Sequence, residues 1–499
     1  MPSRTYESFI ARIKEIRAAQ SVQELLEWDQ QTYMPKKGAA YRAEQVGLIA
    51  GVAHDKLTSA ELGRELAELE REGDGGDDAV ATNVREMRRL YDRAVKLPTR
   101  LVQEIAKATA PASDTWVAAR KDSNFALFAP HLEKLLTLKR EVAERIGWQT
   151  EPYDALIDEF EPGARAAEIQ TVFDALRREL APLVTAITQA PRQPNTALLK
   201  RAAPVEKQAA FNRTIAAAMG FDFDAGRLDV SAHPFCTGLC PLDVRMTTRY
   251  DEHALGQSLF GVMHEAGHGL YEQGLDPAQV GTPMGTYASL GIHESQSRLW
   301  ENQIGRSRPF WQHYFPKLQA EFPAWADVPL EDWHFAINTV RPSLIRVEAD
   351  EVTYGLHIML RFDLERQMLA GRLAVSDVPA AWNERMKQEL GITPPNDAQG
   401  CLQDIHWSLG IFGYFPTYQL GNLYAAQFAL AARRALPDLD GQLARGELRP
   451  LREWLRQNIH RHGRRYRAGE LVQVVTGQEL SHRPFIEYLR AKYQPLYGF

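Results

Sequence analysis

Cysteine is scarce in this chain, which has three in 499 residues. They are Cys236, Cys240 and Cys401, an odd number that does not suit a framework of disulfide bonds. Few cysteines are typical of proteins in a reducing compartment, so we expect free thiols and a cytoplasmic location. Cys236 and Cys240 have no matching second pair, which argues against a zinc site built from cysteine.

An excess of basic residues is also absent, since 58 Lys and Arg face 64 Asp and Glu and the net charge is −6. A nucleic-acid-binding surface needs a basic excess, so we expect no nucleic-acid partner. No uncharged apolar run reaches the roughly 18 residues of a membrane-spanning helix. The first residues also lack the apolar stretch of a secretory signal, so we expect a soluble protein without a membrane partner.

Helical periodicity is present along most of the chain, and nothing resembles a repeat or a flexible tether. The pattern therefore predicts one mostly helical unit covering 1–499. The clearest amphipathic stripe consists of Ile169, Val172, Phe173, Leu176, Leu180, Leu183, Val184 and Ile187.

One segment departs from this pattern. Between 242 and 250 apolar and polar residues alternate, which predicts a half-exposed strand. Such a strand can bind an extended peptide along its edge or can belong to a small structural hairpin, and the sequence leaves both open.

The most informative motif is His264-Glu265-Ala266-Gly267-His268. In a helix, positions four apart lie on one face, so His264 and His268 can reach one metal ion. Glu265 can then take a proton from water whose pKa the metal lowers. The alternative is a helix with two histidines that bind no metal. We expect this helix over about 252–273, with Asp251 as its cap and Gly274 as its stop.

A third protein ligand is needed. Glu272 is excluded, because 264, 268 and 272 form a nearly linear row of about 12 Å on a helix. A second helix is expected over about 292–304 and offers His293 and Glu294, of which we favour Glu294. His293 is then either a ligand or a polar residue lining the site, and Glu301 is a surface acid or a partner of a ligand.

The spacing also excludes one zinc-protease class. The metzincin pattern requires Gly three residues and His six residues after the second histidine, where this chain has Tyr271 and Gly274.

Taken together, the motifs resemble those of the Taq-type metallocarboxypeptidases, distant relatives of angiotensin-converting enzyme and the thimet-type oligopeptidases. The resemblance extends from 25–30 to 460–466 and so covers essentially the whole chain. Besides the metal motif it rests on 233–235 (HPF), 243–247 (DVRMT), 293–295 (HES), 345–350 (IRVEAD) and 400–407 (GCLQDIHW).

The resemblance implies a mainly α, two-lobed zincin peptidase fold with a deep central groove, a small β-sheet beside the metal helix and a homodimer. It implies stepwise removal of C-terminal amino acids from peptides with a free carboxylate. It makes His264, His268 and Glu294 the ligands of one Zn²⁺, for which cobalt is a candidate substitute, and Glu265 the general base.

Arg346 resembles the residue that binds the substrate's terminal carboxylate. A guanidinium suits this role because its planar fork can bind a carboxylate through two hydrogen bonds. The alternative is a structural ion pair, with Glu348 or Asp350 as the partner.

His406 and Tyr418 resemble the pair that lies near the scissile carbonyl in the related oligopeptidases. Both can donate a hydrogen bond to an oxyanion, with Tyr414 as a competing tyrosine and aromatic core packing as the alternative. Three further residues fall in family-like motifs and are candidates for substrate binding, with structural hydrogen bonding as the alternative. They are His233, Arg245 and Gln403.

Two other functions share this chemistry or fold. An oligoendopeptidase or peptidyl-dipeptidase would differ only in the distance from the metal to the carboxylate anchor. An inactive peptide-binding protein would keep the fold alone, and the intact Glu265 and ligand set argue against it.

Overall fold

The computed structural model describes residues 3–499, which form two compact units, each assembled from three separate stretches of chain. The first unit comprises Met1–Val95, Pro194–Ile337 and Gln427–Glu479, and the second comprises Lys96–Gln193, Asn338–Ala426 and Leu480–Phe499. That the whole chain acts as one catalytic domain stays a prediction.

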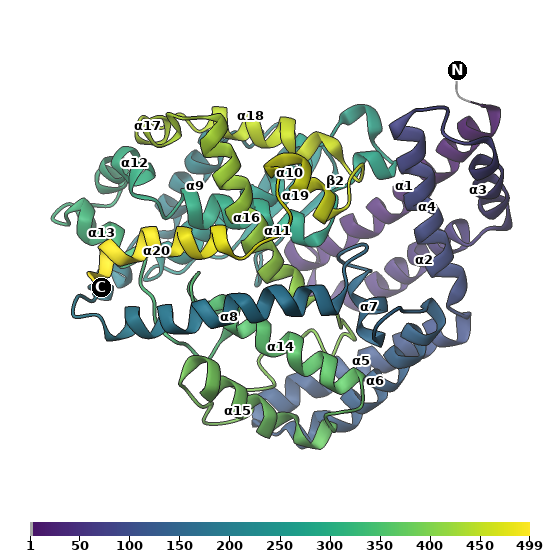
Figure 1. Ribbon diagram of the computed structural model, residues 1–499, viewed down its shortest axis with the longest axis horizontal. Helices are drawn as coiled ribbons and strands as arrows, with labels where there is room; N and C mark the ends of the chain where they lie inside the picture. The colour runs from purple at the N-terminus through teal and green to yellow at the C-terminus, as the bar shows by residue number, and fades with distance from the viewer. Residues whose placement is uncertain (1–2) are drawn as a thin grey trace. The chain divides into compact units, whose positions relative to one another are not determined.

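The first unit contains most of the helices and the sheet (Figure 1). Its helices are α1 (Arg4–Thr32), α2 (Ala39–Leu57), α3 (Ala60–Glu72), α4 (Asp78–Lys96), α9 (Val205–Met219), α10 (Leu255–Gly274), α11 (Leu290–Arg298), α12 (Arg308–Glu321), α13 (Leu330–Ile337), α17 (Leu439–Ala444), α18 (Arg449–Asn458) and α19 (Ala468–Thr476).

The second unit is helical. Its helices are α5 (Thr99–Asp122), α6 (Phe125–Ile146), α7 (Pro152–Ile157), α8 (Ala166–Gln189), α14 (Tyr354–Leu369), α15 (Val378–Leu390) and α20 (Arg483–Tyr497), and α16 (Phe415–Ala435) begins in this unit. The amphipathic stripe predicted from the sequence lies on α8, and seven of its eight apolar residues are buried, Val172 being the exception.

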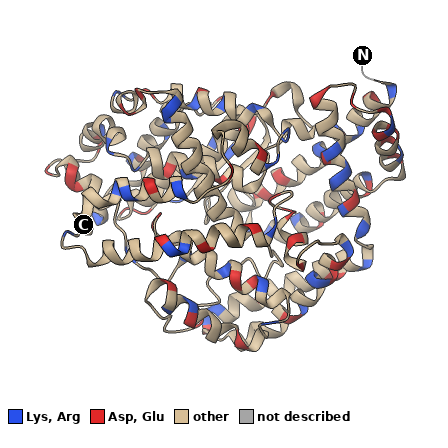
Figure 2. Cartoon of the chain, in the orientation of Figure 1, with Lys and Arg blue, Asp and Glu red and all other residues tan. Residues whose placement is uncertain are grey.

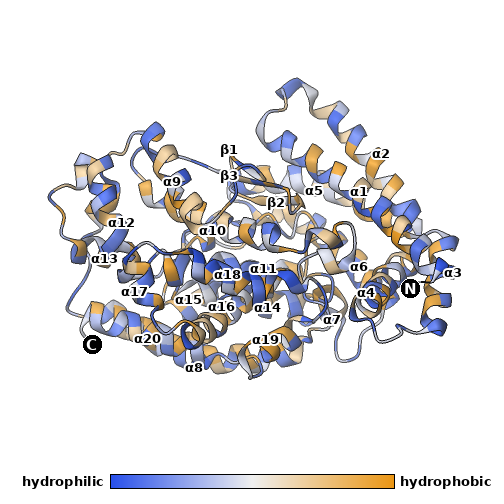
Figure 3. Cartoon of the chain, turned by 90° about the horizontal axis from the view of Figure 1, so that it is seen from above, coloured by the Kyte–Doolittle hydropathy of each residue, from blue (hydrophilic) through white to orange (hydrophobic). Residues whose placement is uncertain are grey.

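The small sheet has the strand order β1-β3-β2. Its strands are β1 (Gly226–Val230), β2 (Cys236–Cys240) and β3 (Asp243–Thr248). β1 is parallel to β3, and β2 is antiparallel to it. β3 falls within the predicted strand, and its Val244 and Met246 are fully buried. The sheet lies beside α10 (Figure 3), so the predicted mainly α fold with a small sheet next to the metal helix is confirmed.

The predicted cap of α10 is wrong. The cap position is Ala254, which offers no side-chain hydrogen bond, and the helix begins at Leu255. Asp251 instead accepts a hydrogen bond from the backbone N–H of His253, 2.8 Å away, in the turn before the helix. Its backbone carbonyl accepts a hydrogen bond from Gln208, which anchors that turn to α9.

Charged residues of both signs alternate along the helices (Figure 2), as the near balance of acids and bases predicts. Among residues 3–499, no helix combines the length and the hydropathy needed to span a membrane.

Candidate metal centre and carboxylate-binding cluster

The metal motif lies on α10, one helical turn placing His264 beside His268 with ring centroids 4.9 Å apart. Glu294 comes from α11, which packs closely on α10 at Gly267. A Cβ atom at Gly267 would lie 2.6 Å from the backbone oxygen of Gln296. The absence of a side chain at this position therefore lets the two helices approach and brings Glu294 to the histidines.

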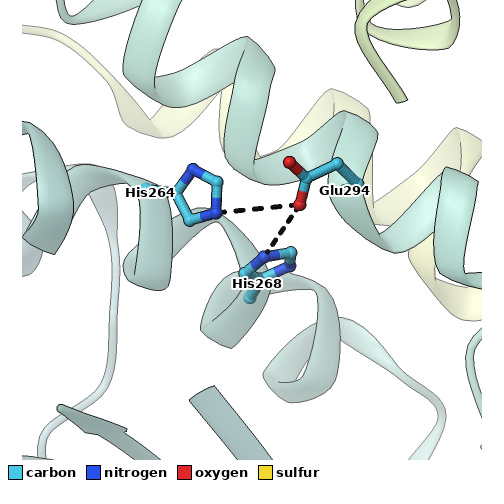
Figure 4. A group of neighbouring side chains, drawn as sticks. All are labelled: His264, His268 and Glu294. Atoms are coloured by element: carbon cyan, nitrogen blue, oxygen red, sulfur yellow. Dashed lines mark ion pairs between the residues drawn. The ribbon is translucent and has the colours of Figure 1, made fainter. Parts of the chain in front are cut away.

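The three predicted ligands converge on one point (Figure 4). Oε2 of Glu294 lies 3.7 Å from Nε2 of His264 and 3.4 Å from Nε2 of His268. Two ligand atoms bound tetrahedrally at about 2.0–2.1 Å lie about 3.4 Å from each other. The spacing and the N₂O donor set therefore fit a three-ligand zinc site with a fourth position left for water or substrate.

Glu301 orients the first histidine. It lies in the π-helical turn Leu299–Ile304 that continues α11, and its Oε2 is 2.9 Å from Nδ1 of His264. Nδ1 is then the protonated nitrogen and Nε2 keeps its lone pair for a metal. Arg298 donates to Glu294 at 2.7 Å and lies 3.4 Å from Glu301. Of the two roles expected for Glu301, the structure supports that of partner to a ligand.

His293 lies against the second histidine and outside the group of ligand atoms. Its ring is nearly parallel to that of His268, with centroids 4.5 Å apart, and the two rings meet edge to edge with their Nδ1 atoms 2.6 Å apart. Its Nε2 is 2.9 Å from Oε1 of Glu272. Glu272, excluded as a ligand by its position on α10, thus contacts a neighbour of the site. The i, i+4 spacing of His268 and Glu272 was the signal for this role.

Glu265 has the properties of a base that water can reach. Its side chain is 6% exposed, and no residue in 3–499 donates a hydrogen bond to its carboxylate. Burial raises the pKa of Glu265 to about 7, a rise that His264 opposes and that the carboxylates of Glu294 and Glu301 reinforce. A carboxylate with this pKa can accept and release a proton near neutral pH.

Arg346 begins a 3₁₀ turn, Arg346–Glu348, in the second unit and is 6% exposed. Its Nε donates to Oδ1 of Asp404 at 2.9 Å, and its Nη2 lies 2.9 Å from the same oxygen. Its Nη1 donates to the hydroxyl of Tyr354 at 2.9 Å. These hydrogen bonds use Nε–H and one N–H of Nη1, so N–H donors remain on both Nη atoms. The edge formed by the two Nη atoms of a guanidinium can bind a carboxylate through two hydrogen bonds.

The expected ion-pair partners of Arg346 were wrong. Glu348 forms no ion pair with it, and the Asp350 carboxylate accepts hydrogen bonds from Arg341, Val352 and Thr353. The partner is Asp404, which the sequence showed only as part of a motif.

Asp404 serves two buried guanidiniums. Arg361, which is fully buried, donates from Nε to Oδ2 of Asp404 at 2.6 Å. Burial would raise the pKa of Asp404, but Arg346 and Arg361 lower it far below its usual range. The cluster of two guanidiniums and one carboxylate therefore carries a net positive charge, which favours the binding of an anion. No sequence pattern singled out Arg361 or Tyr354.

His406 and Tyr418 contact each other in the second unit, with Nε2 of His406 3.2 Å from the Tyr418 hydroxyl. Burial lowers the pKa of His406 to about 3, so its ring is neutral at pH 7. The Tyr418 ring lies 5.0 Å from the Arg346 guanidinium and 5.2 Å from the ring of Tyr414. The structure thus brings the carboxylate-binding candidate and the proposed oxyanion donors together.

The three remaining candidates lie in different surroundings. Gln403 accepts from the backbone N–H of Arg346 and from Arg361, and its amide group donates to three backbone carbonyls, which favours a supporting role. Arg245 pairs with Asp243 at 2.8 Å and lies over the ring of Trp28, also a structural arrangement. His233 is exposed on the loop between β1 and β2.

Known proteins match this chain over its full length. The sequence profile of the carboxypeptidase Taq (M32) metallopeptidases matches residues 8–493. Thermostable carboxypeptidase 1 of Thermus thermophilus is 44% identical over 100% of both chains, and carboxypeptidase 1 of Bacillus subtilis is 40% identical, also over 100% of both. The solved M32 carboxypeptidase of Deinococcus radiodurans R1 is 41% identical, covers 100% of both chains and superposes with a TM-score of 0.97. The chain therefore belongs to the carboxypeptidase Taq (M32) family of metallopeptidases and is a metallocarboxypeptidase.

Proposed function

We propose that this metallocarboxypeptidase uses one Zn²⁺ held by His264, His268 and Glu294. The observation that supports this assignment is the convergence of both Nε2 atoms on Oε2 of Glu294, at 3.7 and 3.4 Å. When bound, zinc lowers the pKa of water and polarises the scissile carbonyl. Cobalt is a candidate substitute because it accepts the same nitrogen and oxygen donors.

Glu265 is the proposed general base. Its carboxylate accepts the proton of the attacking water and passes it to the nitrogen of the leaving amino acid. Its place beside His264 on α10 puts the carboxylate next to the proposed metal, and its burial raises its pKa, so it takes up a proton more readily than an exposed glutamate.

Arg346 is the proposed anchor for the C-terminal carboxylate of a peptide. The support is the net positive charge of the Arg346–Asp404–Arg361 cluster, together with the N–H donors that remain on both Nη atoms of Arg346. A neutral C-terminal amide would not balance that charge. This is the physical basis for a requirement for a free carboxylate.

Tyr418 is the proposed hydrogen-bond donor to the tetrahedral oxyanion, with His406 as its partner or as a second donor. A hydroxyl has one proton, so Tyr418 can donate to the oxyanion only if the neutral His406 donates its Nε2–H to the Tyr418 oxygen, 3.2 Å away. Tyr414 remains the competing tyrosine. His233 is proposed to line the peptide path. Gln403 supports the backbone at Arg346, and Arg245 pairs with Asp243 on β3.

The digestion of a short peptide tests the exopeptidase assignment. Mass spectrometry of the products over time should show successive losses of single C-terminal residues from the free-acid peptide, and a chelator should stop them. Internal fragments would favour an oligoendopeptidase, and losses of residue pairs would favour a peptidyl-dipeptidase. A protein that binds the peptide but does not cleave it, with or without the chelator, would favour the non-catalytic alternative.

We also propose a homodimer in the cytoplasm, with the whole chain acting as one catalytic domain. The three cysteines are free thiols, which fits a reducing compartment. Light scattering of the purified protein tests the dimer.

A further inference from the structure

The two histidines of the metal motif have different hydrogen-bond partners. Nδ1 of His264 contacts a carboxylate directly, at 2.9 Å from Glu301. Nδ1 of His268 contacts another imidazole, at 2.6 Å from Nδ1 of His293, and only the far side of that ring reaches a carboxylate, at 2.9 Å from Glu272.

The direction of the protons follows from the Glu272 carboxylate. A carboxylate only accepts hydrogen bonds, so Nε2 of His293 carries the proton at that contact. Nδ1 of a neutral His293 then has a lone pair and accepts a hydrogen bond from Nδ1–H of His268. Nε2 of His268 is left with its lone pair, and this is the atom that faces Glu294 at 3.4 Å. The Glu272–His293 pair thus selects the tautomer of His268 that can bind a metal.

Aromatic side chains of the first unit pack around the His293 ring of the Glu272–His293 pair. The ring of His293 lies between His268 and two tyrosines, with its centroid 5.4 Å from that of Tyr271 and 4.8 Å from that of Tyr287. Both contacts add to the hydrogen bond with His268, so the ring of His293 has little freedom to rotate.

Strand β2 confines the carboxylate end of the pair. A Cβ atom at Gly238 would lie 2.5 Å from Oε2 of Glu272, so the strand passes directly over this side chain. Nη2 of Arg17 donates to the backbone oxygen of Gly238 at 3.0 Å and holds the strand in place. Glu272 is 7% exposed.

We propose that Glu272 and His293 are positioning residues for the metal, acting in series to present Nε2 of His268. Glu272 fixes the tautomer of His268 through the ring of His293, whereas Glu301 fixes the tautomer of His264 by direct contact. The proposal rests on the metal site proposed above. Residues that orient metal ligands from behind typically change metal affinity by about 10–100-fold when they are replaced.

Zinc affinity of the metal-free protein, measured by competition with a chromogenic chelator, tests the proposal without relying on activity. Glu272→Leu removes the acceptor and His293→Phe removes the intermediate ring, and each should weaken zinc binding about 10–100-fold. Glu272→Gln retains an acceptor oxygen and should give an intermediate affinity. Glu389→Gln changes a glutamate of similar exposure in the second unit and should leave the affinity unchanged.

The double variant separates a series from two independent supports. If Glu272 acts only through His293, then Glu272→Leu should weaken zinc binding no further in a protein that already carries His293→Phe. Multiplicative losses would overturn the proposal, as would wild-type affinity in Glu272→Leu or a full loss in Glu272→Gln.

Two controls keep the outcomes distinct. The melting temperature of each metal-free variant shows whether the fold is retained, and if Glu272→Leu does not fold, His293→Phe and Glu272→Gln still decide the question. Failure of the wild-type protein to bind zinc would overturn the metal site itself. Equal affinities in wild type and variants would overturn only the positioning role.

Discussion

Glu265 combines burial with an accessible carboxylate, and this leads to a prediction at the residue scale. Glu265→Gln has nearly the same shape but cannot accept a proton, so turnover should fall by about 10²–10⁴-fold or more. The zinc content should stay at the wild-type value, because Glu265 lies outside the ligand group. Steady-state kinetics on a zinc-loaded sample checks both points. A fully loaded variant with wild-type turnover would exclude Glu265 as the base.

Arg346 gives a second prediction at this scale. Arg346→Ala removes the donors proposed to bind the substrate carboxylate and should lower kcat/KM for a free-acid peptide by about 10²-fold. The same peptide with a C-terminal amide should be a poor substrate for both proteins, with little difference between them.

The matched variant for this test is Arg346→Lys, which keeps the positive charge beside Asp404 but loses the planar guanidinium. Its kcat/KM for the free-acid peptide should lie between those of the wild type and Arg346→Ala. Equal losses on the free-acid and amidated peptides would show that Arg346 acts by holding the cluster together instead of binding the carboxylate.

Local spacing was enough to predict that His264 and His268 lie side by side, because i, i+4 positions share a helix face whatever the rest of the fold does. Glu294 was favoured over the neighbouring His293, and the family resemblance supported that choice. Local spacing was not enough to predict the residues that contact the candidate ligands and Arg346. The contacts of His293 with His268, and of Asp404 with Arg346, join segments that only the tertiary fold brings together. Sequence spacing alone could not favour Asp404 over the nearer Asp350 and Glu348.

At the scale of helices and strands, the packing of α10 on α11 positions Glu294. Gly267→Ala would place a Cβ atom 2.6 Å from the backbone of Gln296, so the two helices must separate. We expect a loss of about 1–3 kcal/mol in the free energy of unfolding, together with weaker zinc binding. Chemical denaturation and chelator competition measure the two effects.

Gly261→Ala is the matched control on the same helix. Its nearest neighbour would be the Thr248 hydroxyl, 3.9 Å away, so the added methyl group meets no obstacle. Relief of the glycine penalty should stabilise the protein by up to about 1 kcal/mol. If both variants had the same stability and zinc affinity, the close approach at Gly267 would not matter for the site.

The sequence predicted the presence of β3, α10 and α11 correctly but placed their ends less accurately. The strand expected over 242–250 is β3, Asp243–Thr248, and the helix expected over 252–273 is α10, Leu255–Gly274. The second helix, expected over 292–304, is α-helical to Arg298 and then π-helical to Ile304. Apolar periodicity does not distinguish these two helix types, although Glu301 lies in the π-helical part.

At the scale of the whole molecule, some buried titratable groups lower the stability of the fold in acid and others raise it, which predicts an uneven loss of stability as the pH falls. Burial lowers the pKa of His357, His406 and His460 to about 3, from 6.5. Between these values only the unfolded chain binds the protons, so these groups lower stability as the pH falls. Burial raises the pKa of Glu365 and Glu389 to about 7, from 4.5. Between pH 7 and pH 4.5 the folded chain binds more protons at these two glutamates than the unfolded chain does, so they raise stability as the pH falls through this range.

The two effects partly cancel between pH 6.5 and 4.5, where the three histidines outweigh the two glutamates by one proton, about 1.4 kcal/mol per pH unit. Below pH 4.5 the glutamates no longer offset the histidines, and carboxylates whose pKa the fold lowers, such as Asp404, add to the loss, so stability falls more steeply. Denaturant midpoints measured at several pH values should therefore fall slowly and then sharply. A steep fall that begins at pH 6.5 would contradict this balance.

Composition and periodicity did not indicate the division into two units, and only the family resemblance implied two lobes. Each unit is assembled from three stretches of chain, and no Gly-rich or Pro-rich tether marks the points where the chain leaves one unit for the other. Composition and periodicity report local structure, so they predicted the mainly α class correctly but could not locate the boundaries between the units.

The central claim is that His264, His268 and Glu294 together hold the metal. Its most direct test is the zinc stoichiometry of the protein after removal of metal, addition of zinc and gel filtration, compared between wild type and Glu294→Ala. The account predicts one zinc per wild-type chain and little zinc in the variant. Equal zinc in both proteins would contradict it.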